Sequence, residues 1–157
     1  SRPKDMTPYK REVARITNKR REKGALKDIL KGKDVFIGLS APGLVSKQMV
    51  KTMNRRPIIF ALANPVPEIW PKDAEEAGAS IALDGRTINN ALAFPGIIRG
   101  ALDSRAKEIT TEMKFSAAEE IASLAGKNEV VPNFMNIAVH EKVAKAVASA
   151  ARKGRTS

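Results

Sequence analysis

Residues 57–68, PIIFALANPVPE, are the segment around which the fold of this chain is organised. Its first seven residues are apolar, and an Asn-Pro pair followed by a second proline then stops the run. A short apolar run that is closed by turn residues predicts a strand buried on both faces, as in a parallel sheet covered by helices. Ligands bind just outside the carboxyl ends of such strands. Asn64, the first polar side chain after the run, therefore lies where chemistry is expected.

A second stretch, residues 34–43 with the sequence DVFIGLSAPG, has the same arrangement. Its apolar run predicts another buried strand. The strand is followed by a loop of small residues: Ser40, Ala41, Pro42 and Gly43. Two adjacent parallel strands would bring this loop and Asn64 to the same rim of the sheet.

The segments around these two strands predict helices and one further strand. A helix is expected to begin after Ser46 as its N-cap, and a second helix runs from Pro71 to a stop at Gly78. Residues 80–83 predict a third, shorter strand, which an Asp-Gly turn ends. The order strand, helix, strand, helix, strand is typical of the α/β class, with an open, doubly wound parallel sheet.

A glycine-rich phosphate-binding turn is missing from this pattern. Doubly wound dinucleotide domains normally begin with a strand that enters a G-x-G-x-x-G turn, and an acidic residue for the ribose follows about 20 residues later. No glycine triplet with that spacing precedes Asp34. We therefore expect only a partial doubly wound sheet, without its phosphate-binding half.

The C-terminal half predicts a loop with paired amides and a set of helices. The residues after the third strand suggest a loop that carries Asn89 and Asn90, and then a helix that begins at Pro95. Two roles are open for these asparagines: they could cap the helix and form the turn, or they could bind a ligand. This stretch alone favours the capping and turn role. The helix is expected to continue through an apolar stripe that begins at Met113, and a last helix follows over residues 137–152.

The composition fits a single compact domain. The chain has 157 residues and a mass of 17.0 kDa, and its 43% of hydrophobic residues can supply a core. No apolar run approaches the roughly 20 residues that span a bilayer, and the N-terminus has no signal-peptide h-region. The absence of cysteine excludes disulfides and suits a cytosolic protein. We therefore expect a cytoplasmic protein whose first 32 residues form a basic helical arm.

The net charge of +11 makes an anionic partner one hypothesis. Residues 1–31 contain eleven Lys and Arg residues against four acids, and three more basic residues lie at residues 152–155. The basic run at residues 19–21 has no flanking aromatic side chains for base stacking and matches no nucleic-acid-binding motif. A solvated basic helix is the favoured interpretation, with a nucleic-acid-binding protein as the alternative.

The remaining side chains are better suited to binding and orienting than to transferring protons. His140 is the only histidine, and it lies at the start of the last predicted helix, where a surface or helix-end role is favoured over catalysis. The acid pair Glu75-Glu76 consists of helix neighbours that diverge by about 100° and so do not converge on one metal ion. Ser40 has no nucleophile motif, which argues against acyl transfer.

Three stretches together resemble the NAD(P)-binding domain of malic enzyme: DVFIGLSAPG at residues 34–43, IIFALANPVPE at residues 58–68 and NNALAFPGIIRGALD at residues 89–103. They occur in the same order and at similar separations as in that family, and DMTPYKREVARITN at residues 5–18 resembles a further segment of it. The resemblance covers nearly the whole chain. It implies that residues 33–157 are the C-terminal part of a Rossmann-like NAD(P)-binding domain.

Malic enzymes oxidise malate with NAD or NADP and decarboxylate the bound oxaloacetate to pyruvate, with Mg²⁺ or Mn²⁺ as a Lewis acid. The resemblance implies that Asn64 offers its amide to cofactor and substrate near the nicotinamide. It also implies that Asn89 binds the cofactor and that Asn90 binds a malate carboxylate, because an amide donates and accepts without adding charge. The small residues of the first loop would lie along the cofactor: Ser40, Ala41, Pro42 and Gly43.

The resemblance also implies groups that this sequence lacks. The family's catalytic Tyr and Lys and its three carboxylate metal ligands belong to segments expected before Ser1, and nothing here matches them. The family's short polar insert before the paired asparagines is missing, because Thr87 and Ile88 bridge the gap directly. The chain alone is therefore expected to be inactive, and the complete enzyme is expected to be a homo-oligomer.

Two alternatives from other classes stay open at this point. A non-enzymatic docking or regulatory fragment would bind a complete subunit through the apolar strand edge that the missing half leaves bare. A nucleic-acid-binding protein would show an affinity that falls steeply with salt concentration, because phosphate neutralisation releases counterions.

Overall fold

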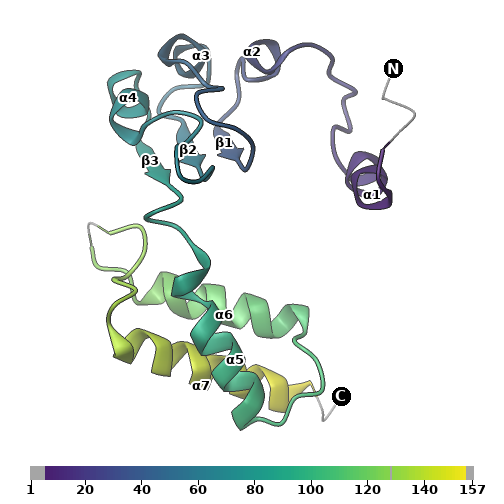
Figure 1. Ribbon diagram of the computed structural model, residues 1–157, viewed down its shortest axis with the longest axis vertical. Coiled ribbons are helices and arrows are strands. Elements are labelled where there is room, and N and C mark those ends of the chain that lie inside the picture. The colour runs from purple at the N-terminus through teal and green to yellow at the C-terminus, as the bar shows by residue number, and fades with distance from the viewer. Residues whose placement is uncertain (1–5, 128, 155–157) are drawn as a thin grey trace. The chain divides into compact units, whose positions relative to one another are not determined.

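The computed structural model describes residues 6–127 and 129–154, and the chain forms two compact units (Figure 1). The first unit ends at Leu83 and the second begins at Asp84. Residues 1–5 of the predicted basic arm lie outside the described residues. The division into an arm at residues 1–32 and a domain at residues 33–157 stays a prediction.

The first unit is built on a three-stranded sheet with the order β1-β2-β3. Its strands are β1 (Val35–Gly38), β2 (Ile58–Ala61) and β3 (Ile81–Asp84). Strands β1 and β2 are parallel, with Val35 opposite Ile58 and Gly38 opposite Ala61. The apolar runs of the sequence therefore form the predicted α/β sheet.

Helices α3 (Lys47–Lys51) and α4 (Pro71–Glu76) pack against one face of this sheet (Figure 1). The predicted N-cap is confirmed, because the Ser46 hydroxyl accepts the N–H of Met49. The short helix α2 (Leu26–Ile29) precedes β1. The buried core of the unit gathers side chains from these helices, the strands and the adjoining loops: Leu30, Val45, Val50, Met53, Ile59, Ala61, Ile69, Ala74 and Ala82.

The other face of the sheet is open among the described residues, so the prediction of a strand buried on both faces is wrong here. Ile58 and Phe60 of β2 are only half-buried. Val35 and Ile37 of β1 and Leu39 just beyond it are 47%, 61% and 79% exposed. These residues alternate with the core residues along each strand, because successive side chains point to opposite faces of a sheet.

The N-terminal segment forms α1 (Pro8–Ile16), which begins after Thr7 as its N-cap. Its apolar residues Val13 and Ile16 are exposed, and none of its residues is buried. None of the described helices is long and apolar enough to cross a membrane.

The second unit is helical and consists of η1 (Asn90–Leu92), α5 (Phe94–Asp103), α6 (Thr111–Ser123) and α7 (Ile137–Lys153). The prediction that the helix from Pro95 continues past Met113 is wrong. The backbone of Arg105 has a φ of +51°, in the left-handed region that ends a helix. A new helix then begins where the Thr110 hydroxyl accepts the N–H of Met113.

Helix α7 packs against both α5 and α6 (Figure 1). The predicted apolar stripe that begins at Met113 lies in the core of this unit. The core combines buried residues of α6 and α7 with one residue of η1: Leu92, Met113, Ala117, Ile121, Val139, Val143, Val147 and Ala151.

Two glycines allow α5 to approach α7 closely. A Cβ atom on Gly96 would lie 2.6 Å from Cγ1 of Val143, and one on Gly100 would lie 2.5 Å from the carbonyl oxygen of Ala144. The second contact is with backbone, which cannot move aside by a rotamer change. The spacing of four residues places both glycines on the same face of α5.

We expect Gly100→Ala to lower the free energy of unfolding of the helical unit by about 1–3 kcal/mol, because the added methyl group forces α5 away from α7. The measurement is urea unfolding followed by far-UV circular dichroism. Gly154→Ala is the matched control, since a Cβ there would meet its nearest atom at 3.8 Å. A Gly100→Ala chain that is as stable as the control would contradict the close packing.

Candidate functional site

The rim predicted from the two apolar stretches is present in the first unit. The ladder between β1 and β2 ends with the N–H of Leu62, which donates to the carbonyl of Gly38 at 2.9 Å. Beyond this bond the chain enters the loop of residues 40–43 on one strand and reaches Asn64 on the other. We call residues 40–43 together with Asn64 the strand-end rim.

The carboxylate of Glu68 holds the two strand ends together. The side chain is fully buried, with 0% of the residue exposed. Its Oε1 accepts the backbone N–H of Ser40 at 2.7 Å, and its Oε2 accepts the backbone N–H of Ala63 at 3.1 Å. We call this arrangement the Glu68 bridge.

The sequence patterns did not identify Glu68 as a functional residue, although it is the last residue of the segment 57–68. One feature of the sequence could have pointed to Glu68: it is a single acidic residue among apolar and turn residues. A carboxylate that is buried in such surroundings needs hydrogen-bond partners. A second feature was Gly38 in the neighbouring strand. A Cβ atom on Gly38 would lie 2.5 Å from Cδ of Glu68, so the glycine leaves room for the carboxylate.

Backbone hydrogen bonds also join the two loops of the rim. The N–H of Gly43 donates to the carbonyl of Pro67 at 3.1 Å, and the N–H of Val45 donates to the carbonyl of Glu68 at 3.0 Å. The φ of Gly43 is +66°, which only glycine adopts without strain. The side chains of Ser40 and Asn64 remain exposed.

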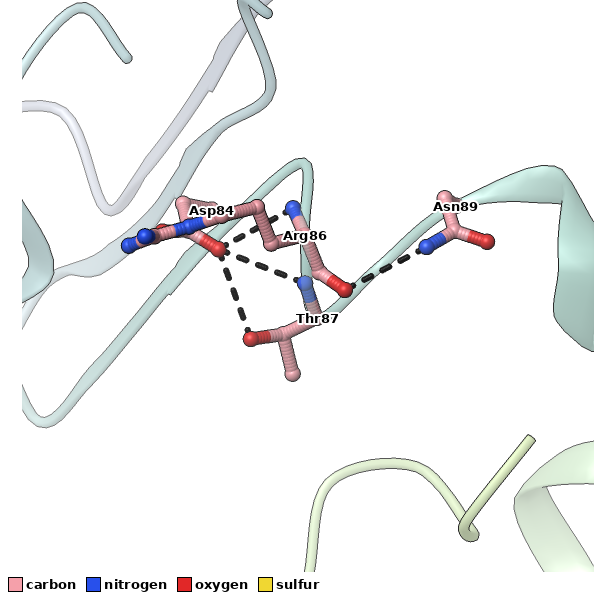
Figure 2. Close-up of polar contacts among 4 residues, drawn as sticks. All are labelled: Asp84, Arg86, Thr87 and Asn89. Carbon is pink, nitrogen blue, oxygen red and sulfur yellow. Dashed lines mark hydrogen bonds and ion pairs between the residues drawn. The ribbon is translucent and has the colours of Figure 1, made fainter. Parts of the chain in front are cut away.

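The paired asparagines lie in the second unit, just after the turn that follows β3. Figure 2 shows Arg86 and Thr87 gathered around the carboxylate of Asp84, with Asn89 reaching back to the carbonyl of Arg86. Oδ1 of Asp84 accepts the backbone N–H groups of Arg86 and Thr87 at 3.1 and 3.3 Å. Oδ2 accepts from the Arg86 guanidinium at 2.6 and 2.9 Å.

The side chain of Asn89 is occupied within its own loop. Its Nδ2 donates to the carbonyl of Arg86 at 3.2 Å, and its Oδ1 accepts the N–H of Ala91 at 2.8 Å, which caps η1. This is the capping role that the stretch alone favoured. Asn90 is exposed and begins η1. The structure therefore brings Ser40, the rest of its loop and Asn64 together in the first unit, whereas both asparagines belong to the second.

The turn around Asp84 is stabilised electrostatically. Burial by itself would raise the pKa of the Asp84 carboxyl, because a charged group loses hydration. The hydrogen bonds and positive charge of Arg86, with the N–H of Thr87, outweigh this effect and hold the pKa below its usual value. The side chain of Asp84 is 4% exposed, whereas that of Arg86 is 66% exposed.

The chemistry of the strand-end rim is that of amides and backbone groups. Asn64 offers a donor and an acceptor without charge, which suits a carboxamide such as that of nicotinamide, or a carboxylate. The described residues contain no cluster of three or more His, Asp or Glu side chains that could hold a metal ion. His140 lies in the first turn of α7, where its Nε2 is 2.6 Å from the carbonyl oxygen of Phe134, so it has the predicted helix-end role.

Comparisons with known proteins point to one family. The profile described as "Malic enzyme, NAD binding domain" matches residues 71–152. The bifunctional malic/malolactic enzyme of Bacillus subtilis is 51% identical to this chain over 96% of the chain and 39% of the relative. The NAD-dependent malic enzyme of Geobacillus stearothermophilus is 48% identical over 92% of the chain and 32% of the relative. Other relatives are named NADP-dependent malic enzymes.

The solved structures agree with the sequence relatives. The crystal structure of malic enzyme from Pyrococcus horikoshii superimposes with a TM-score of 0.88 at 41% identity. The match covers 94% of this chain and 36% of that structure. The chain therefore spans about two fifths or less of the length of the relatives that it matches.

We expect Asp84→Asn to lower the free energy of unfolding by about 1–3 kcal/mol at neutral pH, because it disrupts a buried hydrogen-bond network. The folded pKa of Asp84 lies below the unfolded value, so its stabilisation is present above the unfolded pKa of about 3.9 and is lost as pH falls through the folded pKa. The gap between wild type and variant should therefore shrink below about pH 4.

Urea unfolding at a series of pH values measures this gap. Asp103→Asn is the control, because its ion pair with Arg99 is exposed and should contribute little. A gap that is constant from neutral to acidic pH would show that the Asp84 carboxylate does not stabilise the turn.

Proposed function

The chain belongs to the malic enzyme family, and on that premise we propose that it is the C-terminal part of the NAD(P)-binding domain of an oxidative malate decarboxylase. The complete enzyme would convert malate to pyruvate and CO₂ with NAD or NADP. The observation that carries this proposal is the strand-end rim, where an exposed amide lies beside a loop of small residues at the carboxyl ends of two parallel strands. This is where dinucleotide-binding sheets hold their ligands.

The residues of this chain would bind and orient the reactants. Asn64 would direct its amide toward the nicotinamide and the substrate, and residues 40–43 would lie along the cofactor. The cofactor, when bound, supplies the acceptor for the hydride that leaves malate. Asn90 would contact a carboxylate of malate with its exposed amide. Asn89 would act toward the cofactor mainly by holding the loop, since both ends of its side chain are used within that loop.

The open face of the sheet supports the fragment part of the proposal. The exposed residues Val35, Ile37 and Leu39 form a continuous apolar stripe at the β1 edge, and parallel sheets normally have both faces covered. The remainder of the enzyme subunit would cover this stripe. The proposal also includes a homo-oligomeric complete enzyme in the cytoplasm, where the absence of cysteine is unremarkable.

We assign no catalytic proton transfer and no metal ligand to this chain. The strand-end rim consists of amide, hydroxyl and backbone groups, which do not act as general acid or base at neutral pH. The groups that hold Mg²⁺ or Mn²⁺ and move protons would belong to the remainder of the subunit.

A composite enzyme tests the proposed function. In it, residues 1–157 replace the matching segment of the Bacillus subtilis bifunctional malic/malolactic enzyme. We expect the composite enzyme to form pyruvate and reduced cofactor from malate with Mn²⁺, and we expect the 157-residue chain alone to form none. Turnover by the chain alone would refute the assignment of the acid, base and metal ligands elsewhere, and an inactive, folded composite enzyme would refute the function.

Within the composite enzyme, Asn64→Ala should lower kcat/KM about 10- to 100-fold, because a hydrogen bond to a charged or polarised group contributes about 1.5–3 kcal/mol. Steady-state kinetics with malate and cofactor varied in turn measure the loss. Gln48→Ala removes an exposed amide from α3 instead and should leave kcat/KM unchanged. If both variants have the same kcat/KM, Asn64 is not part of the site.

A further inference from the structure

The strand-end rim has a support that does not itself reach the ligand. Glu68 is fully buried, so it contacts neither cofactor nor substrate. Its carboxylate accepts hydrogen bonds from two backbone N–H groups. One belongs to Ser40, the first residue of the rim loop, and the other to Ala63, the residue directly before Asn64. Each half of the rim is therefore attached to one oxygen of the same carboxylate.

The position of the bridge follows from the geometry of the parallel ladder. The last ladder bond joins Leu62 to Gly38; Ala63 directly follows Leu62, and Ser40 comes two residues after Gly38. Without the carboxylate, these two N–H groups would lose their hydrogen-bond partner in a partly buried region. A carboxylate is the side chain that fits, because it has two acceptor oxygens in a fixed fork and no donor.

The surroundings of Glu68 restrict it to this arrangement. Gly38 lies against the carboxyl group, where a Cβ atom would come within 2.6 Å of Oε1. The backbone carbonyl of Glu68 accepts the N–H of Val45 at 3.0 Å, which attaches the far end of the same loop. Side chain and backbone of one residue thus hold both ends of residues 40–45.

We propose that Glu68 is a positioning residue for the reaction, which holds Ser40 and Asn64 in the register that the cofactor and substrate require. This inference rests on the proposed function. It adds a residue that acts through the strand-end rim rather than on the reacting atoms. A small displacement of positioning groups can cost about 100-fold in rate, so the bridge should affect turnover and not only folding.

The test is Glu68→Gln in the composite enzyme. Glutamine keeps the shape of the side chain but replaces one acceptor oxygen with an amide NH₂, which cannot accept from a backbone N–H. At a temperature where the variant is still folded, we expect its kcat per folded subunit to be about 10- to 100-fold lower than that of the wild type. We expect kcat/KM to fall in parallel. Glu75→Gln makes the same chemical change at an exposed position of α4 and should leave kcat unchanged.

A second measurement separates positioning from loss of fold. In the 157-residue chain, hydrogen exchange at the amides of Ser40 and Ala63 should become faster in Glu68→Gln, while the amides of the β1–β2 ladder keep their protection. Glu68→Asp is the second variant, because it keeps the charge and shortens the reach by one methylene. It should retain one of the two hydrogen bonds and show a kcat between the wild-type and Gln values.

The outcomes distinguish the two proposals. An active composite enzyme whose Glu68→Gln or Glu68→Asp variant keeps the wild-type kcat overturns the positioning role and leaves the proposed function intact. Loss of ladder protection together with the loss of activity also overturns it, since Glu68 would then only maintain the fold. If the folded wild-type composite enzyme shows no turnover, the proposed function is refuted. The role of Glu68 in that reaction is then refuted as well.

Discussion

The constraint on which the first unit depends is the need to satisfy two backbone N–H groups where a parallel ladder stops. The ladder between β1 and β2 ends at Leu62, and the amides of Ser40 and Ala63 lie just beyond its end. Glu68 satisfies both from a fully buried position. The cost of burying a carboxylate is offset only when it is hydrogen-bonded, so the carboxylate and the two strand ends determine one another's positions.

A different constraint organises the second unit. There the backbones of α5 and α7 approach so closely that Gly96 and Gly100 have no space for a Cβ atom. The turn that leads into this unit is ordered by the buried carboxylate of Asp84 and the charge of Arg86. In both units an acidic side chain therefore holds the loop that follows a strand. The exposed amides of Asn64 and Asn90 remain available because neither is used in these networks.

These features bear on the alternatives to an enzyme fragment. The apolar stripe on β1 would also serve a docking fragment, so the open face does not distinguish that alternative from an incomplete domain. Family membership does distinguish the two, because the profile that matches residues 71–152 is that of a NAD-binding domain. The nucleic-acid alternative gains nothing from the structure. The basic residues of α1 lie on an exposed helix, and its one aromatic residue, Tyr9, has no aromatic neighbour there to form a stacking surface.

The local elements could be predicted from the sequence, because short-range patterns are enough to specify them. Apolar runs located β1 and β2, Ser46 located the start of α3, and the periodic stripe that begins at Met113 located the inner face of α6. The pairing of polar groups, in contrast, is set only when distant segments pack together in the folded chain. Glu68 finds Ser40 across 28 positions of sequence, and no local pattern encodes a partner at that distance. The open sheet face and the break at Arg105 likewise depend on what packs against each element, which a single stretch of residues does not contain.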